Sequence, residues 1–426
     1  INYTLSVTQN ILSPKPVYDT SQIIKQLTSS WTDTSNQSFW TNSQATLANS
    51  VISFAINTTT PRNNDETPAE ASGIISMTVL QVVTARLSFH LWDDLISSQL
   101  NESSSPSANI TFNYSSSTNG QTYTNDFRLY TEKPTVFTIH AAQIWLASNW
   151  ASNADTGMVN GGYGLHTMVH EIGHALGLSH PGKYNADSGS PTYDNSAEFA
   201  QDNRQNTVMS YFGGYDPSTG SWAQSKTLAS YQYPQTPMVY DIAAIQSLYG
   251  ADTTTRTDDT TYGYHCSLSN DDLEKSIFDF AINTAPLLTI WDSEGNDTLD
   301  CSNWYSAQNI DLRAGNYSSV RGFNNNVGIA FNTTIERAIG GGGNDTLTGN
   351  DVANVFDGGA GQDTCVYQDW TQYTVSGDAN LASVTDVNHI SDQLISIEYL
   401  QFNGVRVSTS DAVDDAPVGV NDRNNN

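Results

Sequence analysis

Residues 170–181 read HEIGHALGLSHP, and the spacing of the three histidines in this stretch decides the interpretation of the whole chain. His170 and His174 are four residues apart, so on a helix they lie one turn apart on the same face and can hold one metal ion. Gly177 can take a positive φ without steric cost, so the chain can turn back and bring in His180 as a third ligand. Three histidines leave one position of a tetrahedral zinc site open for water, which is typical of catalytic sites.

Glu171 follows the first of these histidines and would lie within reach of water at the open position, which suits a general base. The shorter pattern H-E-x-x-H also occurs where both histidines are ordinary surface residues. Gly177 and His180 extend it, and the extended form favours a catalytic centre over chance. One Zn²⁺ is therefore the expected catalytic cofactor, held by His170, His174 and His180.

The extended pattern resembles that of the metzincin clan of zinc proteases, and Pro181 directly after the third histidine is similar to the serralysin family within it. The runs HPGKYNA at 180–186 and NTVMSYF at 206–212 are also similar to that family's sequence. The resemblance implies that Met209 forms a hydrophobic floor beneath the zinc, although a lone methionine can also be an ordinary core residue. It implies that Tyr211 is a zinc ligand at rest and a catalytic hydrogen-bond donor to the oxyanion when it swings away.

The resemblance also predicts where a substrate binds. In metzincins the strand before the zinc helix lies at the edge of the sheet, and an extended peptide adds to it by backbone hydrogen bonds. Residues 135–147 have the pattern of a strand and precede the zinc motif. The substrate-binding residues expected on this strand are Ala141, Ala142, Gln143, Ile144 and Trp145.

Acidic residues outnumber basic residues by 44 to 16 in this chain of 426 residues, for a formal net charge of −28. Such a chain offers no cationic surface for phosphates, which excludes nucleic acid as a partner. The acidity either solvates the surface of a secreted protein or supplies oxygen ligands for calcium. No apolar run is long enough to span a membrane.

The stretch GGGGNDTLT at 340–348 fits the calcium-binding nonapeptide of a β-roll, in which glycines allow tight turns and an aspartate binds Ca²⁺. A second copy at 349–357 is degenerate, with Asn354 at the aspartate position, and a third at 358–366 is complete. Asp345 and Asp363 are 18 residues apart, so their turns stack one coil apart and can share a calcium ion. A flexible glycine linker is the alternative, but it would not carry aspartates at a fixed period. The residues expected at this calcium site are Gly340, Gly341, Gly343, Asp345, Gly358, Gly359, Gly361 and Asp363.

The runs TTRTDDTTYG at 254–263 and WDSEGND at 291–297 resemble the calcium site at the domain junction of serralysins. The resemblance implies carboxylate ligands from Asp292 and Asp297. It implies mainly backbone oxygens from Arg256, Asp258, Thr260 and Glu294. Family members usually have glycine where this chain has Asp258 and Glu294, and backbone ligation tolerates that change although glycine's conformational freedom is lost.

The predicted fold is α+β: a metzincin-type zinc protease domain with a mixed sheet and long helices, followed by an all-β, calcium-binding parallel β-roll. Apolar periodicity predicts helices near 19–27, over 76–100, from 164 and over 241–249, and strands at 50–58, 109–114 and 135–147. The expected divisions are 1–15 as an N-terminal segment and propeptide remnant, 16–250 as the catalytic domain, 251–366 as the roll, and 367–426 as a closing β-segment with a disordered tail.

Cys266, Cys301 and Cys365 are too few for a disulfide scaffold and odd in number. A bridge between Cys266 and Cys301 stays open as an alternative, but buried thiols are favoured.

These observations predict a secreted, extracellular zinc endopeptidase that cleaves proteins or peptides, is monomeric and contains several structural calcium ions. A proteinaceous inhibitor could also bind it. The start INYTLSVTQN lacks the blocks of a signal peptide. One-step export is therefore expected from the resemblance, although the polar C-terminus does not resemble the family's apolar end. The alternatives are a catalytically inactive calcium-binding adhesion or surface protein with a vestigial metal site, and a metzincin of another branch.

Overall fold

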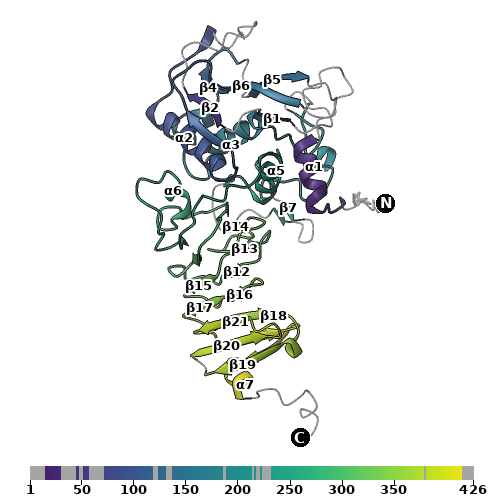
Figure 1. The fold of residues 1–426 in the computed structure, drawn as a ribbon, viewed down its shortest axis with the longest axis vertical. Helices are drawn as coiled ribbons and strands as arrows, with labels where there is room; N and C mark the ends of the chain where they lie inside the picture. The colour runs from purple at the N-terminus through teal and green to yellow at the C-terminus, as the bar shows by residue number, and fades with distance from the viewer. Residues whose placement is uncertain are drawn as a thin grey trace, which may run out of the picture.

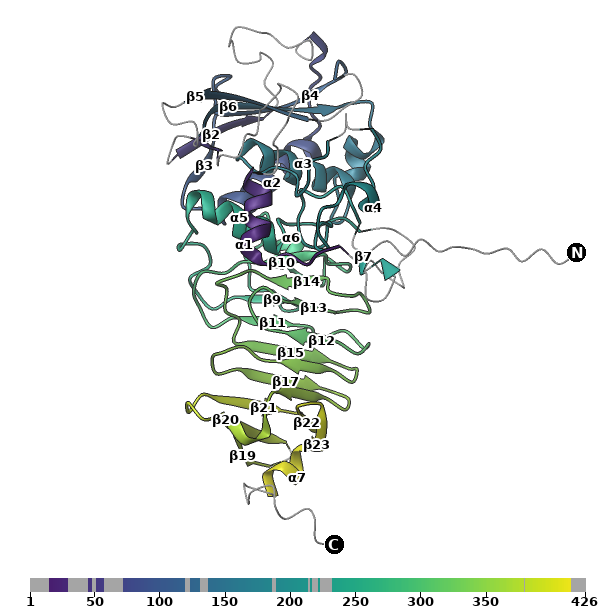
Figure 2. The same cartoon turned by 90° about the vertical axis from the view of Figure 1, so that its right-hand side faces the viewer.

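The computed structural model describes residues 15–29, 45–47, 51–56, 72–118, 123–130, 137–185, 189–213, 215–216, 221–222, 232–378 and 380–414. Figures 1 and 2 show an elongated molecule with a sheet and helices at one end and a stack of short strands at the other. The predicted N-terminal segment up to residue 14 and the predicted tail after residue 414 lie outside the described residues. No described helix is both long and apolar enough to cross a membrane.

The first half of the chain is built on a sheet with strand order β1-β6-β4-β2-β3, and β5 lies beside β6. Only β5 runs antiparallel to its neighbour. The predicted strands at 50–58, 109–114 and 135–147 are confirmed as β2, β4 and β6. The strands are β1 Ala45–Leu47, β2 Val51–Ile56, β3 Gln99–Glu102, β4 Ile110–Ser115, β5 Tyr123–Tyr130 and β6 Phe137–Ala147.

Strand β6 is not an edge strand, so the expectation that residues 141–145 lie at the open edge of the sheet is wrong. β4 pairs with one side of β6, where Ile110 faces Ala142, and β5 pairs with the other side, where Tyr123 faces Trp145. Ala142, Gln143, Ile144 and Trp145 therefore face a strand on both sides, and Ala141 faces Phe127 of β5. In the described part of the chain β5 pairs only with β6, so β5 forms one edge of this sheet and β3 forms another.

Helices α2 and α3 pack against each other beneath this sheet (Figure 2). The indole N–H of Trp92 on α2 donates to the carbonyl of Val169 on α3 at 3.0 Å, and Trp92 is fully buried. The helices predicted near 19–27, from 164 and over 241–249 are confirmed. The helices of this half are α1 Thr20–Ser29, α2 Val79–Asp93, α3 Tyr163–Ala175, α4 Tyr193–Ser196 and α5 Val239–Tyr249.

Helix α2 ends at Asp93, so the predicted end at residue 100 is wrong. The Asp93 carboxylate accepts the N–H of Leu100 at 2.5 Å, which turns the chain back into β3. Leu95 and Leu100 remain buried in the turn and in β3. The apolar periodicity therefore continues past the last helical residue and cannot mark the end of the helix.

The second half of the chain winds into facing sheets of short strands, and the strands between residues 337 and 367 alternate between two of these sheets. Leu347 and Cys365 are fully buried, as the nonapeptide pattern predicts for its inward position. The elements are β9 Thr261–Gly263, α6 Lys275–Phe278, β10 Leu288–Ile290, β11 Thr298–Asp300, β12 Asn309–Asp311, β13 Tyr317–Ser318, β14 Val327–Ile329, β15 Arg337–Gly341, β16 Thr346–Thr348, β17 Val355–Gly359 and β18 Thr364–Tyr367. A small hairpin, β7 Tyr215–Asp216 with β8 Ser221–Trp222, lies before α5.

Parallel pairing continues past Val366, where the sequence pattern ends. Strand β17 pairs in parallel with β21, and β18 pairs in parallel with β22. Ser396 takes a φ of 51° in the turn between them, so this coil turns without a glycine. The remaining elements are β19 Tyr373–Gly377, β20 Leu381–Asp386, β21 Ser391–Ile395, β22 Tyr399–Phe402, β23 Val405–Ser408 and α7 Thr409–Asp414.

Side-chain carboxylates at the turns join each coil to the next. The N–H of Gln308 donates to Asp345 at 2.7 Å, the N–H of Asp345 to Asp363 at 2.7 Å, and the N–H of Asp363 to Glu398 at 2.8 Å. The opposite side has the same arrangement with acceptors Asp297, Glu336 and Asp392. These bonds satisfy backbone donors that the short strands leave unpaired at the turns.

All three cysteines are free thiols, so the bridge between Cys266 and Cys301 is not formed. Cys301 and Cys365 are buried, which confirms that prediction for these two, and Cys266 is half-buried.

Asp392 gives the coiled half a pH-dependent stability. Its carboxylate accepts the N–H of Asn354 at 2.8 Å and the hydroxyl of Tyr367 at 3.1 Å, and burial raises its pKa to about 6. The pKa of an aspartate in the unfolded chain is about 4, so the folded state binds the proton of Asp392 more tightly than the unfolded state does. The stabilisation that this proton gives to the folded state is lost as the pH rises through 6. We expect the free energy of unfolding of Asp392→Asn to rise by about 2 kcal/mol relative to that of the wild type as the pH is raised from 4 to 7. Denaturant unfolding at saturating calcium measures this difference, and parallel pH curves would contradict it.

Candidate active site

The three histidines of the zinc motif lie together in the structure. Helix α3 carries His170 and His174, and Gly177, with a φ of 108°, turns the chain so that His180 faces them. Nε2 of His180 lies 3.2 Å from Nε2 of His174 and 3.4 Å from Nε2 of His170. All three side chains are buried. The predicted spacing thus produces one cluster of imidazole nitrogens.

Backbone carbonyls fix the tautomer of each ring. Nδ1 of His170, His174 and His180 lies 2.8, 2.8 and 2.7 Å from the carbonyl oxygens of Val208, Leu178 and Tyr184, in that order. A carbonyl oxygen only accepts, so Nδ1 carries the proton and Nε2 presents a lone pair. Three lone pairs that converge in a buried space repel one another unless a cation lies between them. The donor set therefore fits a zinc ion with three histidine ligands.

Electrostatics favour the neutral, metal-binding form of these rings. Burial lowers the pKa of His170 and of His180 well below the usual value, and the neighbouring His174 lowers both further. A metal ion therefore does not compete with a proton for these two Nε2 atoms at neutral pH.

Glu171 and Met209 are both buried, and Met209 lies close to the helix that carries His170 and His174. Glu171 is buried in α3 next to His170, and Met209 is fully buried. A Cβ at Gly173 would lie 2.8 Å from the Met209 sulfur and 3.1 Å from Cζ2 of Trp92. Glycine at this position of the motif therefore lets α3 pack directly against the methionine.

Tyr211 lies beside the histidines, as the resemblance implies. Its ring centroid is 4.5 Å from that of His180 and 6.1 Å from that of His170, and the side chain is half-buried. The phenol is therefore near enough to the histidine cluster to act there after a rotation of the side chain.

Asp202 is a buried carboxylate at this site that no sequence motif marks. Its Oδ1 accepts hydrogen bonds from the hydroxyls of Tyr184 at 2.8 Å and Ser210 at 2.7 Å. Its buried Oδ2 has no partner in the described part of the chain. The Tyr184 ring stacks on His180 with centroids 5.3 Å apart, and its carbonyl accepts from the same histidine. Burial raises the pKa of Asp202 to about 7. Asp202 thus connects Tyr184, which contacts His180, to Ser210, which precedes Tyr211.

Asp241, on α5, binds residues 207 and 208, which lie just before Ser210 in the same segment. Its carboxylate accepts the Thr207 hydroxyl at 2.5 Å and the N–H groups of Val208 at 2.7 Å and Met238 at 2.8 Å. Burial raises its pKa to about 7. Because the Val208 carbonyl orients His170, Asp241 contributes to the position of a candidate ligand without touching it.

The aspartates of the nonapeptides lie on adjacent coils, as their spacing predicts. Asp345 accepts the N–H of Gly341 at 2.6 Å, whereas Asp363 has a buried Oδ2 with no partner in the described ranges. Burial raises the pKa of Asp363 to about 7, and the charges of Asp345 and Glu398 add to this shift. A Cβ at Gly361 would lie 2.0 Å from the Gly343 carbonyl, so the coils approach closely at these glycines. An orphan carboxylate oxygen among crowded acids fits a calcium ion.

The two loops predicted to form the junction site lie side by side. The N–H of Thr260 donates to Asp297 at 2.7 Å, and a Cβ at Gly295 would lie 2.8 Å from the Asp258 carbonyl. Asp292 accepts the Tyr262 hydroxyl at 2.6 Å, and burial raises the pKa of Asp292 to about 6 and that of Asp297 to about 7. Clustered, desolvated carboxylates fit a calcium ion here too.

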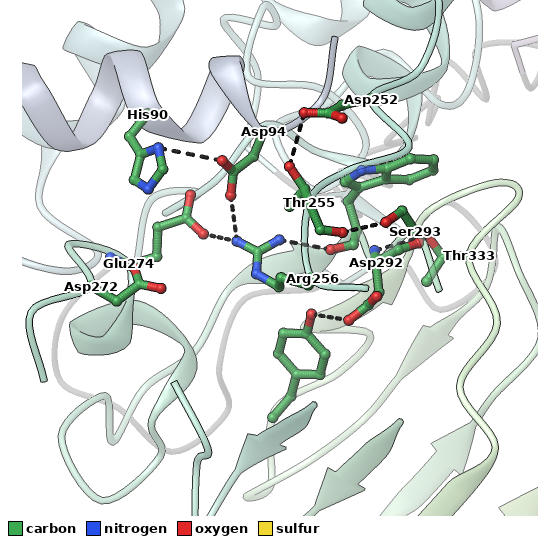
Figure 3. A network of polar contacts seen from close by, with 12 residues as sticks. His90, Asp94, Asp252, Thr255, Arg256, Asp272, Glu274, Asp292, Ser293 and Thr333 are labelled. Carbon is green, nitrogen blue, oxygen red and sulfur yellow. Dashed lines mark hydrogen bonds and ion pairs between the residues drawn. The ribbon is translucent and has the colours of Figure 1, made fainter. Parts of the chain in front are cut away.

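The side chain of Arg256 connects this junction to the first half of the chain (Figure 3). Its guanidinium pairs with Asp94, directly after α2, at 2.7 Å, contacts Glu274, and donates to the Trp291 carbonyl at 2.9 Å. Its backbone has a φ of 52°, which is unusual outside glycine. His90, Asp93 and Asp94 form a second group of metal-ligating side chains in the described ranges, but Asp94 is already paired with Arg256.

Comparison with known proteins agrees with this geometry. A family model described as Peptidase M10 serralysin C terminal matches residues 251–416. Serralysin B of Dickeya chrysanthemi is 40% identical over 289 residues, which are 66% of this chain and 56% of that protein. The chain belongs to the serralysin family.

Other relatives match to a similar extent. Serralysin of Proteus mirabilis is 40% identical over 291 residues, 65% of this chain and 55% of that protein. Metalloprotease AprA of Pseudomonas entomophila is 38% identical over 286 residues, 65% of this chain and 54% of that protein. The chain thus spans little more than half the length of these relatives.

Asp202 gives a test of how this serralysin holds its histidines. Asp202→Asn keeps an oxygen for Tyr184 and Ser210, whereas Asp202→Leu leaves both buried hydroxyls without an acceptor. We expect the leucine variant to bind Zn²⁺ roughly 10- to 100-fold more weakly than the wild type, and the asparagine variant to stay close to the wild type. Competition with a chromophoric chelator measures both affinities. Equal affinities in the two variants would contradict this role.

Proposed function

We propose that this serralysin is a secreted zinc-dependent endopeptidase. The observation that carries the proposal is the convergence of three buried Nε2 lone pairs, from His170, His174 and His180, next to Glu171. A vestigial site in a calcium-binding surface protein would be expected to lack a ligand or the base, and here all four residues are present and buried. Pro181 and the calcium repeats favour the serralysin branch over another metzincin branch.

The residues of the site have distinct tasks in this mechanism. When bound, zinc supplies a Lewis acid that polarises a carbonyl group and lowers the pKa of water to about 7. Glu171 accepts the proton of the attacking water and delivers it to the leaving amine. Tyr211 donates a hydrogen bond to the oxyanion, and a well-placed donor of this kind contributes about 3 kcal/mol. The Nδ1 hydrogen bonds hold the three imidazoles in one orientation throughout.

We infer that the substrate is a protein or peptide bound as an extended strand along the outer edge of β5. The support is that β5 has one unpaired side in the described sheet and packs against α3, which carries two of the histidines. An added strand is held by its backbone, so side-chain preference is left to neighbouring pockets.

We further propose that Ca²⁺ occupies the two candidate sites and stabilises the coiled half as a β-roll. Asp345 and Asp363 would share one ion with nearby glycine carbonyls. The loops around residues 256–260 and 292–297 would hold another, in contact with the Arg256 network that reaches Asp94. Calcium at the junction would therefore stabilise the position of the end of α2 in the first half of the chain. A monomer, one-step export and a proteinaceous inhibitor are further expectations of this proposal.

Replacing the base tests the catalytic assignment. Glu171→Gln preserves size and hydrogen bonding but cannot take up the proton. We expect zinc content to remain at one ion per chain and casein cleavage to fall by about 10³-fold or more, since proton transfer is lost. Metal analysis and a casein assay on the same sample check both parts. Substantial cleavage by the metal-loaded variant would refute Glu171 as the base.

Selective removal of calcium tests the role of the coiled half. We expect a calcium chelator, with free Zn²⁺ buffered at a constant level, to unfold the coils because the clustered carboxylates then repel one another. Far-ultraviolet circular dichroism should show loss of β-structure, and casein cleavage should fall in parallel. Added Ca²⁺ should restore both, whereas Mg²⁺ should not, because it demands a tighter octahedral shell. Full activity and an unchanged spectrum without calcium would contradict the proposal.

A further inference from the structure

Arg204 lies on a platform of two aromatic rings at the start of the helix that carries His170 and His174. Its guanidinium carbon is 5.9 Å from the ring centroid of Tyr163, the first residue of α3, and 5.3 Å from that of Tyr233. Its backbone N–H donates to the Phe212 carbonyl at 2.8 Å, which ties it to the segment that carries Tyr211. The rings and this bond fix the direction of the side chain.

The guanidinium has no carboxylate partner among the described residues. Its Nε is buried and makes no hydrogen bond. By contrast, Arg86 pairs with Glu102, Arg256 with Asp94, and Arg313 with Asp311. In a chain with 44 acidic and 16 basic residues, a shortage of acids does not explain an unpaired cation. Desolvating a guanidinium without a partner costs free energy, which a bound anion would offset.

A series of ring contacts runs from the cation to the candidate catalytic centre. The His166 ring lies 5.5 Å from the Tyr233 ring and 6.1 Å from the His170 ring, so Tyr163, His166 and His170 follow one another along one face of α3. Arg204, Tyr163 and Tyr233 are each only half-buried, so this group reaches the surface.

We propose that Arg204 binds a carboxylate of the peptide substrate in a subsite next to the scissile bond. The planar guanidinium offers two parallel N–H donors that match a carboxylate, and stacking on the tyrosines orients it before the substrate arrives. The carboxylate can come from an aspartate or glutamate side chain or from a peptide C-terminus. This inference rests on the proposed peptidase function and adds that the peptidase prefers substrates with a carboxylate near the scissile bond.

Matched peptides test the subsite. One set places Glu or Gln in turn at each of three positions on either side of the scissile bond, and a second set carries a free acid or an amide at the C-terminus. In the wild type we expect kcat/KM for one acidic peptide to exceed that of its neutral match by about 10-fold or more, as for a charge-assisted hydrogen bond. Arg204→Gln should reduce this ratio to near one while it leaves cleavage of the neutral peptide almost unchanged. Arg204→Lys should keep part of the preference, and Arg86→Gln, which removes a surface pair, should keep all of it.

Binding provides a second readout that does not depend on cleavage. In the Glu171→Gln background, fluorescence anisotropy should give a tighter Kd for the acidic peptide, and adding Arg204→Gln should abolish that difference. The proposal is overturned if the wild type shows no acidic preference, if Arg204→Gln retains it, or if Arg204→Gln weakens acidic and neutral peptides equally. Preferential binding of the acidic peptide without cleavage by the wild type would support the subsite and refute the peptidase function.

Discussion

Three hydrogen bonds from imidazole Nδ1–H groups to backbone carbonyls are the constraint on which the rest of the catalytic half depends. They set the tautomer of His170, His174 and His180 and thereby direct three lone pairs at one point. Two of the carbonyls belong to residues that buried carboxylates hold: Asp202 binds Tyr184, and Asp241 binds Val208. The candidate metal centre is thus the innermost layer of a polar network, and residues outside the histidine cluster set the orientation of its ligands.

Much of the site follows from the sequence because its residues are local. Four-residue spacing on one helix places His170 and His174, and a single glycine places His180. Asp202 and Asp241 could not be predicted, since they act across 18 residues to Tyr184 and 33 residues to Val208. Arg204 also carries no motif, and its position next to Tyr163 depends on tertiary packing. Sequence spacing thus predicts metal ligands that lie close together in the chain. It does not predict the distant residues that hydrogen-bond to the segments around those ligands.

The fold was predictable where a period is maintained and not where tertiary contacts interrupt it. Helix α2 ends at Asp93 although Leu95 and Leu100 keep its apolar rhythm, because a side-chain bond from Asp93 turns the chain. Strand β5 was not predicted, and its presence moved the open sheet edge away from residues 141–145. The coil extends beyond Val366 because backbone pairing to β21 and β22 needs no nonapeptide. Side-chain carboxylates at the turns hold those coils together as well.

X-ray absorption spectroscopy of the apo protein reconstituted with Zn²⁺ tests the central claim most directly. We expect one tightly bound ion per chain with a first shell that includes three imidazole nitrogens at about 2.0 Å. His180→Ala should lower the number of imidazole ligands to two. A shell without three imidazoles, or a wild-type protein that takes up no zinc when correctly folded with calcium, would contradict the account.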